Sequence, residues 1–144
     1  MVQSIMDGEQ VSFEFEIPAT DALGRLHVAG KLRALEREVL LHWKIKDRTF
    51  TRSKNSLRTV ELTYDDIEEA AINHHLWFFK PHLVMKIKDP RKVEEVPGVK
   101  LGRIELNLPG KSKDEANRFV EMIDFRVSQH EMEKRSERLK ELGI

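Results

Sequence analysis

The sequence contains no cysteine and no apolar stretch of the roughly 20 residues that span a bilayer. The missing thiols exclude disulfides and thiolate zinc sites, and they make a reducing compartment the simplest expectation. Residues 1–10 also lack the basic start and the apolar run of a secretory signal. Together these absences predict a soluble, cytoplasmic protein with no transmembrane segment.

An excess of charge of either sign is missing as well. The 25 basic residues balance the 25 acidic ones, so net charge gives no reason to expect nucleic acid or a membrane as partner. The charges are nonetheless segregated, because residues 1–24 hold five acids and no base, whereas residues 25–58 hold ten bases and three acids. We interpret most of this pattern as solvent faces of neighbouring strands with opposite charges across from one another.

A long helix is predicted over residues 112–142. Its apolar residues recur at steps of three and four, which places them on one helix face. They are Ala116, Phe119, Val120, Ile123 and Val127. Ser112 and Glu115 have the spacing of a capping box, in which the serine oxygen accepts a hydrogen bond from a first-turn N–H and the glutamate reaches back. Residues 128–144 would then form a polar helical extension.

Upstream of the helix, apolar and polar residues alternate in seven segments, with the period of strands that bury one face. The segments are 11–17, 26–34, 39–46, 57–63, 67–73, 83–88 and 103–108. Strands joined by such short connections must be antiparallel. In the second segment, Gly30 indicates a bulge or a close approach of the backbone.

The predicted fold is therefore mainly β with a C-terminal α-helix, a seven-stranded antiparallel barrel or orthogonal sandwich capped by one long helix. The 144 residues suit one domain. Residues 11–127 would form the barrel and its capping helix, after a flexible N-terminus of residues 1–10. The alternative fold is a lipocalin-like barrel with an internal ligand cavity.

Several segments also show a sequence pattern that is more detailed than the alternation of apolar and polar residues. Residues 58–68, Arg-Thr-Val-Glu-Leu-Thr-Tyr-Asp-Asp-Ile-Glu, form a strand, a polar turn and an isoleucine, and residues 83–88, 102–106 and 116–123 follow in order. The sequence pattern of these segments and the order of the elements resemble the pleckstrin-homology (PH) superfold, specifically the bacterial PH-like domains and their GRAM relatives. The resemblance covers about residues 11–127 and implies a PH-like barrel.

The eukaryotic members of that superfold carry a lipid-binding signature, a Lys-X-basic arrangement across the first hairpin. Here Lys31-Leu32-Arg33 has the spacing but falls in the second predicted strand. The resemblance therefore does not imply phosphoinositide binding.

Basic residues are concentrated on the second and third predicted strands and the loop that follows. Several could share one face or rim and bind the phosphate groups of a lipid, a nucleotide or another anion. The candidates are Lys31, Arg33, Lys44, Lys46, Arg48 and Arg52. The competing interpretation is a solvated strand face. Nucleic acid is not expected, because Phe50 is the one aromatic residue of the loop that could stack on a base.

Apolar residues mark a second candidate surface. Three consecutive aromatic residues at positions 77–79 cannot all face one side of a strand, so an exposed cluster that contacts a protein or a membrane surface is one interpretation and local core packing the other. Phe125, Met132 and Leu139 recur every seven residues, which indicates a partner helix. Because the other seam positions are polar, we expect a solvated or dimer-crossing end instead of a coiled coil. The predicted interface residues are Trp77, Phe78, Phe79, Met132 and Leu139.

Catalytic patterns are weak. His74 and His75 point to opposite faces of an extended segment, so we expect no metal site, and the carboxylate pairs at positions 65–66 and 68–69 diverge. The sequence has no glycine-rich phosphate loop and no nucleophile elbow.

We expect a non-enzymatic bacterial PH-like module without a cofactor, whose partner is another protein or a second copy in a homodimer. The alternative is binding of a lipid headgroup, another anion or a small ligand through residues 31–58.

Overall fold

Seven strands and one long helix make up the part of the chain that the computed structural model describes, residues 9–17, 26–47, 57–73 and 81–143. The strands are β1 (Val11–Ile17), β2 (Leu26–Ala34), β3 (Glu38–Asp47), β4 (Arg58–Thr63), β5 (Ile67–Asn73), β6 (His82–Ile87) and β7 (Arg103–Asn107), and the helix is α2 (Lys113–Glu141). Three short 3₁₀ turns connect them: η1 (Tyr64–Asp66), η2 (Pro90–Val93) and η3 (Gly110–Ser112). The predicted class, mainly β with a C-terminal helix, is confirmed, and the seven strands and the helix each begin and end within one residue of the predicted positions.

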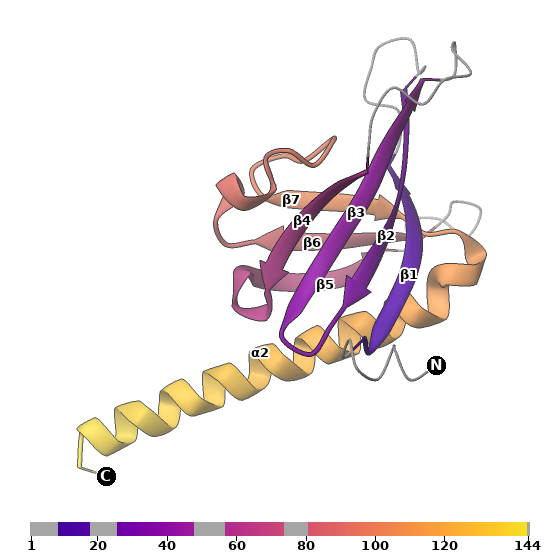
Figure 1. The fold of residues 1–144 in the computed structure, drawn as a ribbon. Helices are drawn as coiled ribbons and strands as arrows, with labels where there is room; N and C mark the ends of the chain where they lie inside the picture. The colour runs from indigo at the N-terminus through magenta and orange to yellow at the C-terminus, as the bar shows by residue number, and fades with distance from the viewer. Residues whose placement is uncertain (1–8, 18–25, 48–56, 74–80, 144) are drawn as a thin grey trace.

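The strands form one antiparallel sheet in the order β4-β3-β2-β1-β7-β6-β5. A single residue pair, Glu16 with Asn107, joins β1 to β7, and the sheet turns sharply at this point. Strands β1–β4 and β5–β7 therefore form two layers that cross one another (Figure 1). Because β4 and β5 remain the two edges, the sheet is a folded sandwich and not a closed barrel.

The core lies between the two layers, and it is filled by the apolar side chains that alternate with polar ones along the strands. In β1, Val11, Phe13, Phe15 and Ile17 are all buried, while Glu14 is exposed. Gly30 lies opposite Phe15 on β1, and the register of β2 is continuous through it, so there is no bulge at that point. A Cβ atom at Gly30 would lie 2.2 Å from the carbonyl oxygen of His42 and 2.5 Å from Cζ of Phe15. The close approach is thus why glycine is needed.

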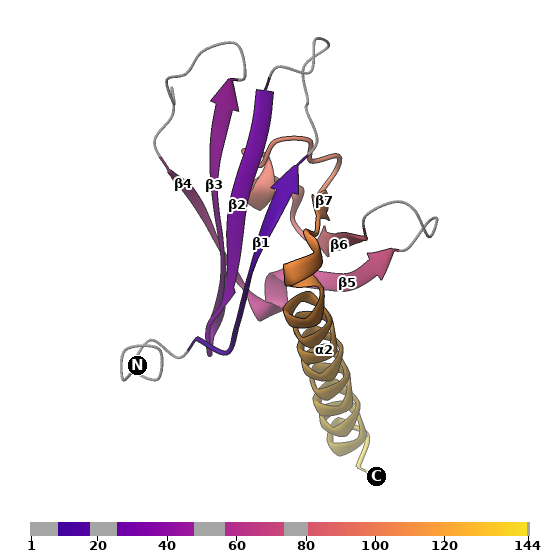
Figure 2. The same ribbon diagram turned by 90° about the vertical axis from the view of Figure 1, so that its right-hand side faces the viewer.

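Helix α2 covers one open end of the sandwich with the face that its spacing predicted (Figure 2). Ala116, Phe119 and Ile123 are buried, and the Phe119 ring meets the Phe13 ring edge-on with their centroids 6.0 Å apart. Val120 and Val127 pack against the same core from its margin. Residues 131–143 are exposed throughout, and in Figure 1 the helix continues well past the sheet.

The capping box predicted at Ser112 is wrong. The chain enters α2 through η3, in which the Ser112 N–H donates to the Pro109 carbonyl at 2.9 Å, so Ser112 already has helical dihedrals (φ −94°, ψ −10°) and its side chain forms no cap. Glu115 instead accepts hydrogen bonds from the Ser12 N–H at 3.4 Å and from Arg118 at 2.7 Å. An N-cap serine normally has extended dihedrals, which the preceding turn prevents here.

The two described residues that precede β1 lie against β2. Glu9 and Gln10 belong to the predicted flexible N-terminus, but both contact β2: the Gln10 N–H donates to the Ala34 carbonyl at 2.9 Å, and Glu9 pairs with Arg33. Residues 1–8 lie outside the described residues. In the described ranges, no helix has the length and apolar character needed to cross a bilayer.

Candidate functional site

Three of the predicted anion-binding residues lie on the outer face of the β2–β3 hairpin. Strand alternation turns Lys31 and Arg33 of β2 away from the buried Leu32, and the register places Lys31 opposite His42 of β3, two residues before Lys44. The structure therefore brings Lys31, Arg33 and Lys44 to one face. Lys46 belongs to β3, but its side chain, together with Arg48 and Arg52, lies outside the described residues.

This outer face carries a shallow, open hollow of about 330 Å³. Its lining consists of Glu14, Phe15, Glu16, Ala29, Gly30, Lys31, His42, Lys44, Leu57 and Pro109. Bases and acids share the surface: Arg33 Nε lies 2.8 Å from Glu9 Oε1, and Lys111 Nζ lies 2.5 Å from Glu14 Oε2. The hydrogen bond from Lys111 holds the pKa of Glu14 below its ordinary value. The pairing of Arg33 with Glu9, and the position of Lys31 opposite Glu14 in the β1–β2 register, thus account for part of the basic pattern.

His42 lies in the lining of the hollow and was not among the predicted binding residues. Its Nδ1 is 2.8 Å from Thr59 Oγ1, while Nε2 is buried and makes no hydrogen bond with any described residue. Burial lowers the pKa of His42, and the nearby Arg33 and Lys31 lower it further. At neutral pH the imidazole is therefore uncharged, and the positive charge of the hollow comes from Lys31 and Lys44.

The predicted apolar interface is described only on the helix. The aromatic residues Trp77, Phe78 and Phe79 lie outside the described residues. On α2, the side chains of Phe125, Met132 and Leu139 are 62%, 66% and 47% exposed. Phe125 follows the buried Ile123 by two residues, about 200° around the helix axis, and so points away from the sheet. We call Phe125, Met132 and Leu139 the outer stripe of α2.

A clamp at the start of the extension sets the direction in which α2 leaves the sheet. The Arg126 guanidinium lies 3.9 Å from the centroid of the Tyr64 ring, and its Nη2 donates to the Glu36 carbonyl at 3.1 Å. The Tyr64 hydroxyl donates to the carbonyl of Leu35. Helix, η1 and the β2–β3 turn are thereby joined. No local pattern could have identified this clamp, because its partners lie 29 and 90 positions apart.

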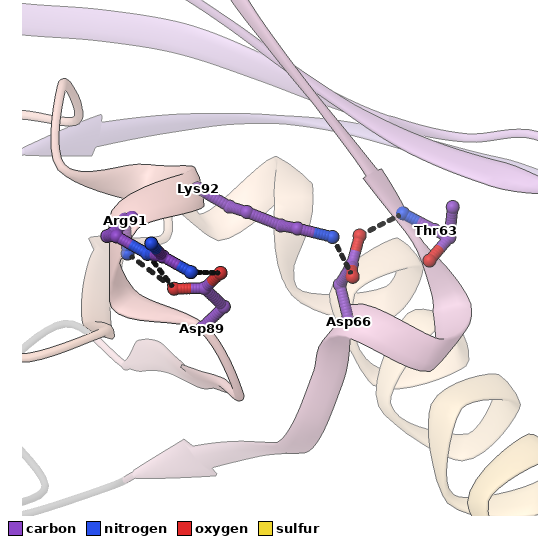
Figure 3. A network of polar contacts seen from close by, with 5 residues as sticks. All are labelled: Thr63, Asp66, Asp89, Arg91 and Lys92. Carbon is purple, nitrogen blue, oxygen red and sulfur yellow. Dashed lines mark hydrogen bonds and ion pairs between the residues drawn. The ribbon is translucent and has the colours of Figure 1, made fainter.

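The carboxylate pair at positions 65–66 contributes to structure through Asp66 (Figure 3). Asp66 Oδ2 accepts a hydrogen bond from the Thr63 N–H at 2.8 Å, and Oδ1 lies 2.6 Å from Lys92 Nζ of η2. Burial opposes ionisation of this carboxyl, but the hydrogen bonds from Lys92 and Thr63 outweigh it, and the pKa of Asp66 is lowered. On η2 itself, Asp89 binds Arg91 at 3.1 Å. The contact between Asp66 and Lys92 holds η1 against η2.

Cofactor chemistry and homology add little to this geometry. Among the residues that the structure describes, no three His, Asp or Glu side chains gather closely enough to hold a metal ion. Comparisons with known proteins find no matching family model, no matching curated protein and no matching solved structure. The function must therefore be argued from the two surfaces above, the outer hollow and the outer stripe of α2.

Proposed function

We propose that this chain is a non-enzymatic PH-like domain that binds a second copy of itself through the outer stripe of α2. The observation that carries the proposal is a line of three large apolar side chains, exposed on a helix that continues past the sheet. Burying apolar surface stabilises a contact by roughly 25 cal/mol per Å². A partner that covers Phe125, Met132 and Leu139 would therefore be favoured.

The extension itself also favours a partner. Residues 131–143 are exposed along their whole length, so no side chain there is buried against the rest of the fold. Short helices without tertiary packing are marginal in water. A second helix along this segment would supply the packing that the sheet does not reach.

Two further observations support the other two parts of the proposal, the PH-like fold and the non-enzymatic role. Seven antiparallel strands followed by one helix agree with the order of elements on which the PH-like resemblance rests. The carboxylates of Glu14, Asp66 and Asp89 are each engaged by a cation that fixes local structure. Catalysis by acid and base needs such groups to converge on a substrate, so this use supports a binding role.

The proposal is tested by the molar mass of the full chain in solution, measured by light scattering over a range of concentrations. We expect a mass that rises toward the dimer, and a monomer at every concentration for Met132→Lys. The matched control is Leu101→Lys, which changes an exposed leucine (95% exposed) on the β6–β7 connection and should behave as the wild type. A monomeric wild type, or an equally dimeric Met132→Lys variant, would contradict the proposal.

A second function is favoured by the hollow on the outer face of the hairpin. Lys31 and Lys44 line it beside Nε2 of His42, which has no hydrogen-bond partner among the described residues, and ammonium groups of this kind bind small anions. Titration with inorganic phosphate should then give an affinity that falls with salt and is lost in Lys31→Glu. The control Lys100→Glu, on the β6–β7 connection, should bind as the wild type does. Equal affinity in both variants would exclude the hollow as the site.

A further inference from the structure

We propose that the two copies pair their α2 helices antiparallel, with Met132 at the two-fold axis, so that Phe125 of each copy packs against Leu139 of the other. This inference rests on the self-association proposed above and specifies its geometry. The occupant of the outer stripe is then a second copy of this chain. Three features of α2 bear on this geometry: the face on which the stripe lies, the charges beside it, and the length of the contact.

The stripe lies where a second helix can approach without displacing either sheet. Ile123 is buried against the core, and Phe125 lies about 200° from it around the helix. Successive stripe residues are seven positions apart, so the stripe drifts by only about 20° per step. In an antiparallel pair centred on Met132, the end of one helix lies beside Phe125 of the other. The two folded bodies then lie on opposite sides of the helix pair.

Charges beside the stripe distinguish the two possible directions. Asp124, Glu131 and Arg138 each precede a stripe residue by one position and so share one flank, and Arg135 lies on that flank one turn after Glu131. All four side chains are exposed. Acids thus occupy the first half of this flank and bases the second half.

In an antiparallel pair with a two-fold axis perpendicular to the helices, this flank meets the same flank of the other copy in reverse order. Asp124 then faces Arg138 of the second copy, and Glu131 lies next to Arg135 of the second copy. Near the axis the two Glu131 side chains also approach each other, as do the two Glu133 side chains on the other flank, but these two like-charge contacts are fewer than the four contacts between opposite charges. Opposite charges at such flanking positions select partner and direction.

A parallel pair would bring the flank against the opposite flank, where Arg126, Glu133 and Lys140 each follow a stripe residue by one position. Arg126 is held in the clamp by Tyr64 and the Glu36 carbonyl, which leaves Glu133 and Lys140. Glu131 would then lie near Glu133 of the second copy and Arg138 near Lys140, and these like-charge contacts outnumber the attraction of Arg135 for Glu133. Like charges at these positions are unfavourable. The charge pattern therefore favours the antiparallel direction.

The contact is short. From Phe125 to Leu139 the helix rises about 21 Å, which gives three apolar layers. Coiled coils that are stable on their own sustain such layers over more heptads. The dimer is therefore expected to dissociate on dilution, and its helices to be exchangeable between molecules.

The absence of cysteine from the chain permits a direct test of direction by disulfide crosslinking. Phe125→Cys and Leu139→Cys variants of the full chain are prepared separately, mixed above the dissociation concentration, oxidised, and examined by intact mass. The two substitutions change the mass by different amounts, so mixed and self-crosslinked dimers are distinguishable. Leu101→Cys, at a more exposed position on the β6–β7 connection, measures crosslinking by random collision.

We expect the mixed dimer of Phe125→Cys with Leu139→Cys to form well above the Leu101→Cys background, with neither variant crosslinking to itself. Self-crosslinking of Phe125→Cys would show a parallel pair and overturn the inference. Background crosslinking in all samples, with a wild-type dimer by light scattering, would overturn the inference while leaving self-association in place. A monomeric wild type would overturn both.

The pairing of Asp124 with Arg138 of the second copy is tested by exchanging their charges. Asp124→Arg alone should weaken the dimer about 5–10-fold, because it places like charges opposite each other. Arg138→Asp alone should do the same, and the double variant should recover most of the affinity. Recovery is not expected for a parallel pair, so an additive loss in the double variant would overturn the proposed register.

Discussion

At the scale of single residues, the fold is tightly packed where β1, β2 and β3 meet. Gly30 pairs with Phe15 on one side and Trp43 on the other, and the Phe15 ring covers the place where a side chain would begin. Backbone and ring leave no space for even one methyl group. This site therefore depends on the absence of a Cβ atom, although Gly30 needs no unusual dihedral.

Gly30→Ala is predicted to lower the free energy of unfolding by more than about 2 kcal/mol, as overpacking of a rigid site does. The added Cβ would lie 2.2 Å from a backbone oxygen, which cannot rotate away. Urea denaturation measures the effect. Gly110→Ala is the control, because a Cβ there meets nothing within 4 Å; losses of similar size in both variants would contradict the explanation.

His42 predicts a response of stability to pH. Its folded pKa is lowered by burial, Arg33 and Lys31, so between that value and the unfolded value of about 6.5 the unfolded chain binds the proton more readily. The contribution of His42 to stability is therefore complete above about pH 6.5 and is lost as the pH falls through the folded pKa. Denaturation curves at pH 7.5 and below should show a steeper loss for wild type than for His42→Asn. Identical slopes in the two proteins would contradict this assignment.

At the scale of elements, short polar turns fix how the two layers and the helix meet. The η1 turn contacts η2 through Asp66 and Lys92 (Figure 3), and it contacts α2 through Tyr64 and Arg126. This turn of three residues thus joins both η2 and α2. Asp66, one of its two acidic residues, is a structural anchor, which explains why the carboxylate pair at 65–66 does not converge on a pocket.

Asp66→Ala is predicted to lower the free energy of unfolding by about 1–3 kcal/mol, the usual cost of losing hydrogen bonds to a charged group. The side chain is only 15% exposed, so water replaces these bonds poorly. Denaturation at pH 7 measures the loss. Asp89→Ala, whose partner Arg91 is two residues away and highly exposed, should cost less.

The same residue also shapes stability in acid. Because the folded pKa of Asp66 is lowered, its contribution is complete above the unfolded value of about 3.9 and is lost as the pH falls through the lower folded pKa. The difference in stability between wild type and Asp66→Ala should therefore shrink below about pH 4. A difference that stays constant into stronger acid would show that the ion pair is not its cause.

At the scale of the whole molecule, the start and the end of α2 differ in how they are packed. Ala116, Phe119 and Ile123 complete the core, whereas residues 131–143 bury no side chain in it. Folding stability and self-association should therefore be separable along one helix.

A chain that ends at Lys134 is predicted to unfold within about 0.5 kcal/mol of the full chain when both are monomeric, since removal of exposed surface residues changes little. It should no longer dimerise, because Leu139 and Arg138 are absent. Denaturation at low concentration and light scattering at high concentration measure the two properties. A large loss of stability would show that the extension packs on the fold, and an intact dimer would place the contact elsewhere.

Local periodicity was enough to determine the elements of this protein. Alternation in β1 and the steps of three and four in α2 depend only on neighbours along the chain, and Phe13, Phe15 and Phe119 are buried where those periods place them. The outer stripe was visible for the same reason, since Met132 and Leu139 are spaced along one helix face. Such signals come from the geometry of strands and helices, which every segment carries by itself.

Contacts between distant positions were decided only by the tertiary structure. Ser112 lost its expected cap because η3 turns the chain into the helix. The Tyr64–Arg126 clamp, the Asp66–Lys92 pair and the position of His42 beside Lys31 and Lys44 all depend on where strands and turns meet in space. A side chain's partner and pKa follow from surroundings that no local period encodes. The sequence therefore determined which faces are apolar, and the tertiary structure decided which of them are covered and which remain exposed.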